Sequence, residues 1–154
     1  MGHAINIAMN KVNTKYSSVI WPDQIYLSTT TIKRTMDFFI KKKSILCFPV
    51  YKKKLPYVYV LRDKNKKFKD IIQTRETKKK VKFGESDCGF FVFQSKIVRE
   101  KLKFFIKKKL LTTKKTQEID FLKSFKFLNK FGQVTTIKAG SYKDTIGINF
   151  LKRD

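Results

Sequence analysis

The chain has 154 residues, enough for one domain with a single core, and its 42% hydrophobic content excludes wholesale disorder. The net charge is +24, because 36 Lys and Arg residues stand against 12 Asp and Glu residues. No apolar run approaches the roughly 20 residues of a membrane span, and the N-terminus lacks a signal-peptide pattern, so we expect a cytoplasmic protein with no membrane partner.

The hydrophobic spacing alternates between strand and helix patterns along the whole chain. In chain order we predict a helix over 3–12, a strand over Ser17–Trp21, a helix over Ser28–Lys41, a strand over Ser44–Tyr51, a hairpin of Tyr57–Arg62 and Lys67–Thr74, a strand over Asp87–Gln94, helices over Ser95–Lys109 and Gln117–Phe131, a strand over Gln133–Ala139 and a turn over Asp144–Phe150. This order is typical of an α/β fold, here a three-layer α/β/α domain with a mostly parallel sheet and one inserted antiparallel hairpin. No linker or repeat divides it, so residues 1–154 form a single domain.

The basic and sulfur-containing residues narrow the possible functions. Lysine runs occur at 41–43, 52–54, 78–80 and 107–109, each at an expected loop or element end. They are interpreted as solvated loop lysines or, alternatively, as a basic module for RNA or anionic surfaces, which would need them on one face with aromatic residues. We favour the first interpretation and expect no nucleic-acid partner.

Cys47 and Cys88 stand apart in apolar stretches, as reduced thiols do, and His3 is the only histidine, which excludes a histidine-rich metal cluster.

One of the few acidic residues, Asp23 in WPDQ, follows directly after the first predicted strand. Ligands of open α/β sheets bind beyond the carboxyl ends of strands, and Mg²⁺ takes one or two hard oxygen ligands from a protein. A carboxylate at this place could hold such an ion. Asp is also a common turn residue, so a purely structural role stays open at this point.

Six segments in order resemble the GT-A-like nucleotidyltransferases, which include sugar-1-phosphate nucleotidyltransferases and, more distantly, molybdenum-cofactor guanylyltransferases. They are GHA, WPDQIYLSTTTI, PYVYVLRDKNKKFKDIIQTRE, GESDCGFFVF, QEIDFLKSF and DTIGIN. The resemblance covers nearly the whole chain and implies a Rossmann-like α/β domain. It also implies transfer of a nucleotidyl group from a nucleoside triphosphate to a sugar phosphate, with release of pyrophosphate.

The resemblance assigns roles to individual residues. It implies that Asp23 and Asn149 of GIN hold Mg²⁺, and that the two side chains approach each other. It places Gly2, His3, Gln24, Glu76 and Asp87 on the substrate side. The structural alternatives are a loop acid for Glu76, a strand-entry cap for Asp87 and a turn residue for Asn149.

The family's Gly-rich loop, which binds the triphosphate, has no counterpart among the six scattered glycines. We therefore expect the C-terminal two-thirds of such a domain, incomplete at its N-terminus and weak or inactive alone. An upstream fragment that supplies the loop would then be a partner. We also expect an open sheet edge where the first strands of the family are absent.

Overall fold

The computed structural model describes residues 1–77, 81–113 and 116–148, and it has the expected α/β architecture. Its helices are α1 (Gly2–Met9), α2 (Thr29–Lys42), α3 (Ser95–Lys107) and α4 (Ser124–Leu128), with short 3₁₀ helices at Thr74–Glu76 and Tyr142–Thr145. Its strands are β1 (Tyr16–Ile20), β2 (Leu46–Lys54), β3 (Val58–Arg62), β4 (Phe68–Gln73), β5 (Phe83–Asp87), β6 (Phe90–Gln94) and β7 (Val134–Lys138). No described helix is long and apolar enough to cross a membrane.

The main sheet has five strands in the order β1-β6-β2-β5, with β7 on the other side of β2. β7 lies parallel to β2, whereas β6 is antiparallel to both β1 and β2. Strands β1, β2 and β7 therefore point the same way, and β5 and β6, which pair antiparallel to β2, run against them. Most strands point in one direction, as expected, but β5 and β6 run the other way, so the sheet is mixed.

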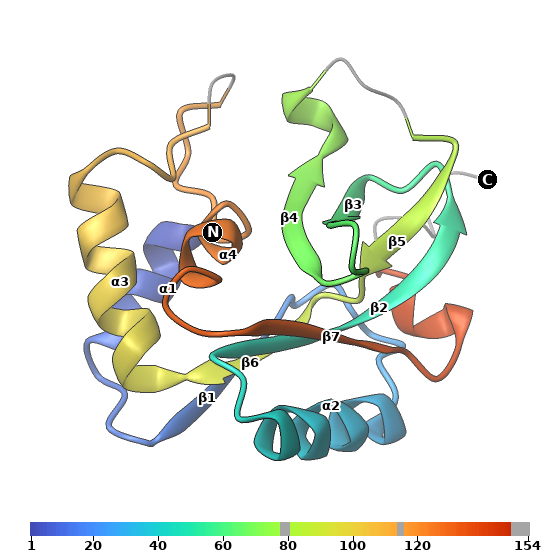
Figure 1. Ribbon diagram of the computed structural model, residues 1–154, viewed down its shortest axis with the longest axis horizontal. Coiled ribbons are helices and arrows are strands. Elements are labelled where there is room, and N and C mark those ends of the chain that lie inside the picture. Colours follow the sequence, from blue (N-terminus) through green and yellow to red (C-terminus); the bar gives the residue numbers. More distant parts are fainter. Residues whose placement is uncertain (78–80, 114–115, 149–154) are drawn as a thin grey trace.

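Three layers result (Figure 1). Helix α2 covers one face, where Phe39 packs with Cys47, Phe90 and Val92. Ser28 caps this helix by accepting a hydrogen bond from the N–H of Thr31 at 3.2 Å.

The other face carries the larger core and the remaining elements. Helices α1, α3 and α4 lie on one side of this face, and the β3–β4 hairpin lies on the other (Figure 1). Phe48 of β2 connects the two sides, because its ring contacts Phe68 of the hairpin and Phe125 of α4. The predicted hairpin is confirmed, and its register shifts between Leu61 and Arg62.

The structure differs from the predicted elements at two places. The expected helix over Gln117–Phe131 is wrong over most of its length, since only Ser124–Leu128 is α-helical. Gln117 has a positive φ of 56°, and Ile119 forms a β-bridge with Thr112, so the chain is extended before the helix begins. The strand β5 was not predicted, because FGES lacks an apolar pattern and forms a strand only by pairing with β2.

Candidate active site

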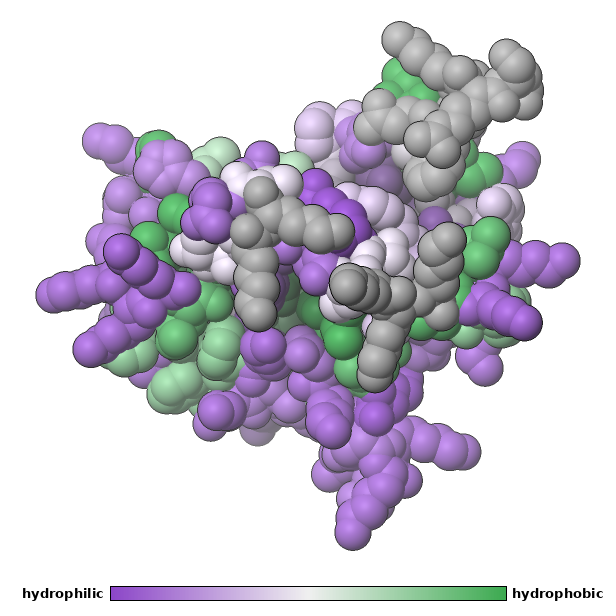
Figure 2. All heavy atoms as spheres, turned by 90° about the horizontal axis from the view of Figure 1, so that it is seen from above, coloured by the Kyte–Doolittle hydropathy of each residue, from purple (hydrophilic) through white to green (hydrophobic). Residues whose placement is uncertain are grey.

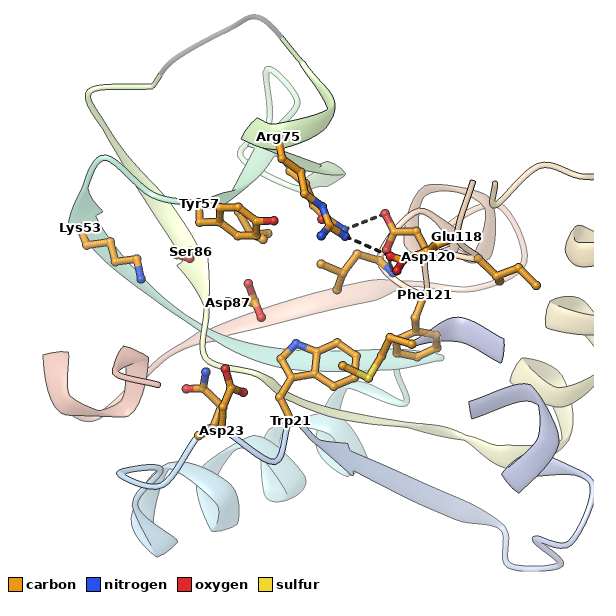
Figure 3. Close-up of a pocket in the computed structure, with 16 residues that line it drawn as sticks. Trp21, Asp23, Lys53, Tyr57, Arg75, Ser86, Asp87, Glu118, Asp120 and Phe121 are labelled. Carbon is orange, nitrogen blue, oxygen red and sulfur yellow. Dashed lines mark hydrogen bonds and ion pairs between the residues drawn. The ribbon is translucent and has the colours of Figure 1, made fainter. Parts of the chain in front are cut away.

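A cavity of about 360 Å³ lies between the two sides of the larger-core face. Trp21, Asp23 and Gln24 enter it from the carboxyl end of β1 (Figure 3). The rest of the wall comes from Met1, Lys53, Tyr57, Val58, Gln73, Arg75, Ser86, Asp87 and residues 118–122. The cavity thus joins segments that lie between Met1 and Leu122 and are far apart in the sequence.

The turn after β1 orients the acidic end of the cavity. The N–H of Trp21 donates to the carbonyl of Gly89 at 2.8 Å, and the N–H of Gln24 donates to the carbonyl of Trp21 at 3.0 Å. Gly89 has a φ of +66°, and a Cβ there would lie 2.4 Å from the Gln24 side chain and 2.9 Å from the Trp21 ring. Only glycine fits both the conformation and the space at this position.

Asp87 lies at the end of β5 and points into the cavity, with Lys53 and Asp23 on either side (Figure 3). Burial raises the pKa of this carboxyl above its ordinary value. The N–H of Gly89, which donates to Asp87 Oδ2 at 3.0 Å, and the charge of Lys53 oppose the increase, while the charge of Asp23 adds to it. Burial also lowers the pKa of Lys53. These opposed charges, held close together in a cavity, are typical of a functional site.

The predicted partner of Asp23, Asn149, lies outside the described residues. The residues just before position 149 nevertheless contact Asp23. The N–H of Ile148 donates to the Asp23 carbonyl at 2.8 Å, and a Cβ on Gly147 would lie 3.0 Å from Asp23 Oδ2. The segment at 147–148 therefore contacts the turn after β1.

The opposite wall holds a buried polar pair. The side-chain amide of Gln73 donates to Asp120 Oδ2 at 2.8 Å, and both residues are only 8% exposed. Asp120 Oδ1 also accepts the N–H of Leu122 at 2.9 Å. Burial raises the pKa of Asp120, although the Leu122 hydrogen bond opposes this. This pair connects the hairpin to the segment before α4, across the cavity.

Arg75 projects into the cavity beside this pair (Figure 3). Its guanidinium lies 3.8 Å from a carboxylate oxygen of Glu118 and 3.8 Å from one of Glu76. These distances are too long for hydrogen bonds, so the cation remains able to bind a closer anionic group.

The other predicted substrate residues lie elsewhere. Glu76 is next to Arg75, but it is not among the residues that line the cavity, and its Oε1 is buried with no hydrogen-bond donor among the described residues. Gly2 is packed against Ile119, where a Cβ would lie 2.7 Å from the carbonyl oxygen. His3 is on the exposed side of α1. Of the predicted residues, the structure brings Asp23, Gln24 and Asp87 together in the cavity.

Among the polar residues of the cavity that sequence reasoning missed are Lys53, Gln73, Arg75 and Asp120. Three of these stand inside the segments QTRE and QEID, in which only Glu76 was given a role. Lys53 was hidden in a run of three lysines, of which Lys52 and Lys54 are exposed. The alternation of a strand could have separated it, because the middle residue faces the other side of the sheet.

The lysine runs do not form one group. The described runs lie at the ends of α2, β2 and α3, which are well separated in space (Figure 1). Apart from Lys53, their lysines are exposed, and hydrophilic side chains project on several sides of the cavity face (Figure 2). The run at 78–80 lies outside the described residues.

The architecture is a Rossmann-like α/β fold that is shared with solved structures of low sequence identity. Among solved structures, the chain is similar to a structure presented as a glucose-1-phosphate thymidylyltransferase from Bacillus anthracis in complex with sucrose, with 17% identity, a TM-score of 0.67 and coverage of 92% of this chain and 53% of that one. It is also similar to HddC from Yersinia pseudotuberculosis, with 16% identity, a TM-score of 0.59 and coverage of 92% and 54%. The chain thus spans about half the length of both neighbours. No family model matches it, and no curated protein matches it by sequence.

Proposed function

We propose that the cavity is the Mg²⁺ and sugar-phosphate side of a nucleotidyltransferase site. The reaction joins a nucleoside triphosphate to a sugar phosphate and releases pyrophosphate. The observation that carries the proposal is the convergence of Asp23, Gln24 and Asp87 with Lys53 on one cavity, in a fold of this type. Asp23 and Gln24 come from the turn after β1, Lys53 comes from β2, and Asp87 comes from the end of β5.

The donor set fits Mg²⁺. Asp23 supplies a carboxylate, and the Oε1 atom of Gln24 is buried without a hydrogen-bond donor among the described residues. No group of three or more His, Cys, Asp or Glu side chains able to hold a metal occurs within 1–77, 81–113 and 116–148. Mg²⁺ needs fewer, since it keeps several waters and takes one or two carboxylates together with substrate phosphates.

We assign Asp23 as the main ligand, with Asn149 as the second protein ligand that the resemblance implies. When bound, Mg²⁺ would supply the positive charge that holds the phosphates of both substrates together.

The chain's own residues would bind and orient the sugar phosphate. Lys53 and Arg75 are the cations of the cavity and can pair with phosphate oxygens. Trp21, whose ring centre lies 6.3 Å from that of the buried Phe121, can offer an apolar surface for a sugar ring. Gln73 and Asp120 can hydrogen-bond sugar hydroxyls. Such a reaction depends on positioning and charge neutralisation and needs no nucleophilic side chain.

The test is a thermal unfolding series with MgCl₂ and glucose 1-phosphate. A ligand at about 100 times its Kd stabilises a folded protein by about 2.7 kcal/mol, so the wild type should unfold at a higher temperature when both are present. Asp23→Asn should lose the Mg²⁺-dependent part of this shift. Asp37→Asn is the matched control, since Asp37 is exposed on α2 and lies outside the cavity. An unchanged shift in Asp23→Asn would contradict the proposal.

Turnover is a separate question, because this sequence contains no Gly-rich loop to bind the triphosphate. We expect little or no pyrophosphate release from the chain alone. Removing a single preorganised donor from such a site costs about 10²–10³ in rate. Co-expression with a fragment that carries such a loop should restore turnover. A steep fall of RNA binding with salt would instead favour the basic-module alternative.

A further inference from the structure

The charge of the cavity differs in sign from that of the chain. The chain has 36 Lys and Arg residues but 12 Asp and Glu residues. Four of those 12 acids line the cavity: Asp23, Asp87, Glu118 and Asp120. Of the described Lys and Arg residues, Lys53 and Arg75 alone line it, so two cations against four carboxylates leave a formal charge of −2. A negative cavity in a chain of net charge +24 favours a ligand with a positively charged group.

The excess negative charge lies at one end of the cavity. At the other end, Lys53 and the Mg²⁺ of the proposed function balance Asp23 and Asp87. Glu118 and Asp120 lie together on the side away from Lys53 (Figure 3). A ligand that binds with its phosphate near Lys53 therefore places its far end beside these two acids.

The extended backbone before α4 directs both acids to the same place. Ile119 forms an antiparallel β-bridge with Thr112, and the N–H of Thr113 donates to the carbonyl of Glu118 at 2.9 Å. Side chains two positions apart in an extended segment point to the same side. Glu118 and Asp120 therefore face one region of the cavity.

Asp120 can accept a further hydrogen bond from a ligand. It is 8% exposed and accepts one hydrogen bond at each oxygen, from Gln73 and from Leu122, whereas a carboxylate has about four lone-pair sites. Burial raises its pKa, and the charges of Lys123 and Arg75 oppose this rise without cancelling it. A further cation beside Asp120 would favour its ionised form.

Arg75 does not neutralise this end of the cavity. Its guanidinium lies 3.8 Å from a carboxylate oxygen of Glu118 and 3.8 Å from one of Glu76. The charge of Arg75 also acts on Asp120, so one cation serves three acids. This excess would repel a second anionic group of the ligand and would attract an ammonium group.

We propose that the substrate is a sugar phosphate with a free amino group, whose ammonium lies between Glu118 and Asp120 and whose phosphate lies toward Lys53. This inference rests on the proposed function, since it takes the cavity as the sugar-phosphate site. An ammonium has three N–H donors and no acceptor, which matches a pair of carboxylates. A hydroxyl at the same place would gain less, because hydrogen bonds between ionised groups are about twice as strong as neutral ones.

The test is calorimetric titration, in the presence of MgCl₂, with glucose 1-phosphate and with its four analogues that carry an amine in place of the hydroxyl at carbon 2, 3, 4 or 6. At least one amine should bind about tenfold more tightly than glucose 1-phosphate. This preference should fall as pH rises through the pKa of the amine of the ligand, because the neutral amine has no charge to pair.

Glu118→Gln removes one carboxylate from an exposed position, so the fold should tolerate it, and the preference should fall about threefold or more. Glu100→Gln is the matched control, since Glu100 is exposed on α3 and lies outside the cavity, and it should keep the full preference.

The inference is overturned if none of the four amines binds more tightly than glucose 1-phosphate, or if Glu118→Gln keeps the full preference. In either case the proposed function stands as long as glucose 1-phosphate binds with MgCl₂. If none of the five sugar phosphates binds, the proposed function fails and the inference fails with it.

Discussion

Two acids in different regions of the molecule, the buried Asp144 and the partly buried Asp87, have pKa values shifted in opposite directions. Asp144 is 0% exposed and accepts hydrogen bonds from the N–H of Ser28 at 2.7 Å, the hydroxyl of Thr31 at 2.8 Å and the N–H of Ser141 at 2.9 Å. Burial alone would raise its pKa, but these donors outweigh burial and hold the pKa below its ordinary value.

Asp87, by contrast, has a raised pKa, because burial exceeds the help from Gly89 and Lys53 and because Asp23 adds a like charge. The first region uses its carboxylate to connect the 3₁₀ helix at Tyr142–Thr145 to the start of α2. In the second region, the carboxylate of Asp87 lies at a cavity wall and accepts a hydrogen bond from the N–H of Gly89. An acid with several hydrogen-bond donors thus maintains the fold, whereas an acid with few donors in a cavity marks the candidate site.

The largest expected effect is that of Asp144→Ala. It leaves three donors without their acceptor, so we expect a loss of about 3 kcal/mol in the free energy of unfolding at pH 7, measured by urea denaturation. Because the folded pKa is lowered, the carboxylate stabilises the fold above its unfolded pKa of about 3.9, and this contribution disappears as pH falls through the folded value. The difference between variant and wild type should shrink over that range. A loss below about 0.5 kcal/mol, the range of ordinary surface substitutions, would contradict this role.

Gly89→Ala should have the next largest effect. The substitution forces a Cβ onto a residue with φ +66° and into the Gln24 and Trp21 side chains, so we expect a loss of about 2 kcal/mol. It should also weaken glucose 1-phosphate binding by displacing Trp21. Gly132→Ala is a useful comparison, since its Cβ would contact only the Ile45 side chain, at 3.2 Å. Equal losses in the two variants would show that the cavity turn has no special requirement for glycine.

Asp87→Asn should act in the opposite direction from Asp144→Ala and raise the free energy of unfolding by about 1 kcal/mol at pH 7. Its folded pKa is raised, so the ionised carboxylate destabilises the fold at neutral pH, and stability returns as pH falls below the folded pKa. The gain should therefore vanish in acid. Asp37→Asn should show no gain at either pH. A destabilised Asp87→Asn would place Asp87 with Asp144 as a structural acid.

The smallest effect concerns the thiols. Burial raises the pKa of Cys47 to about 11 and that of Cys88 further still, with the charge of Asp87 adding to the latter. At pH 8 the folded protein should therefore react slowly or not at all with a thiol reagent, and both cysteines should react in denaturant. Rapid reaction of Cys88 in the folded protein would show that the wall beside Asp87 opens readily.

Much of the fold was predictable from local patterns. The helix that begins at Ser28, the apolar run of β2 and the hairpin each depend on residues near one another in sequence, and each was confirmed. The segment before α4 was not predictable, because Phe121, Phe125 and Leu128 repeat at helical spacing although Gln117 turns the chain with a positive φ. These three side chains are buried, but the predicted α-helix was wrong over residues 117–123 and 129–131.

The amino-acid pattern alone predicts an α/β fold, reduced thiols and an acidic residue at the carboxyl end of the first strand. Which polar residues share a cavity depends on contacts in the folded chain. Asp87 reaches Asp23 and Lys53 because β5 pairs with β2, where Val50 lies opposite Asp87, and Gln73 meets Asp120 across 47 positions of the chain. The physical reason is that burial and neighbouring charge set the properties of an acid, and both arise from contacts between segments that are distant in sequence.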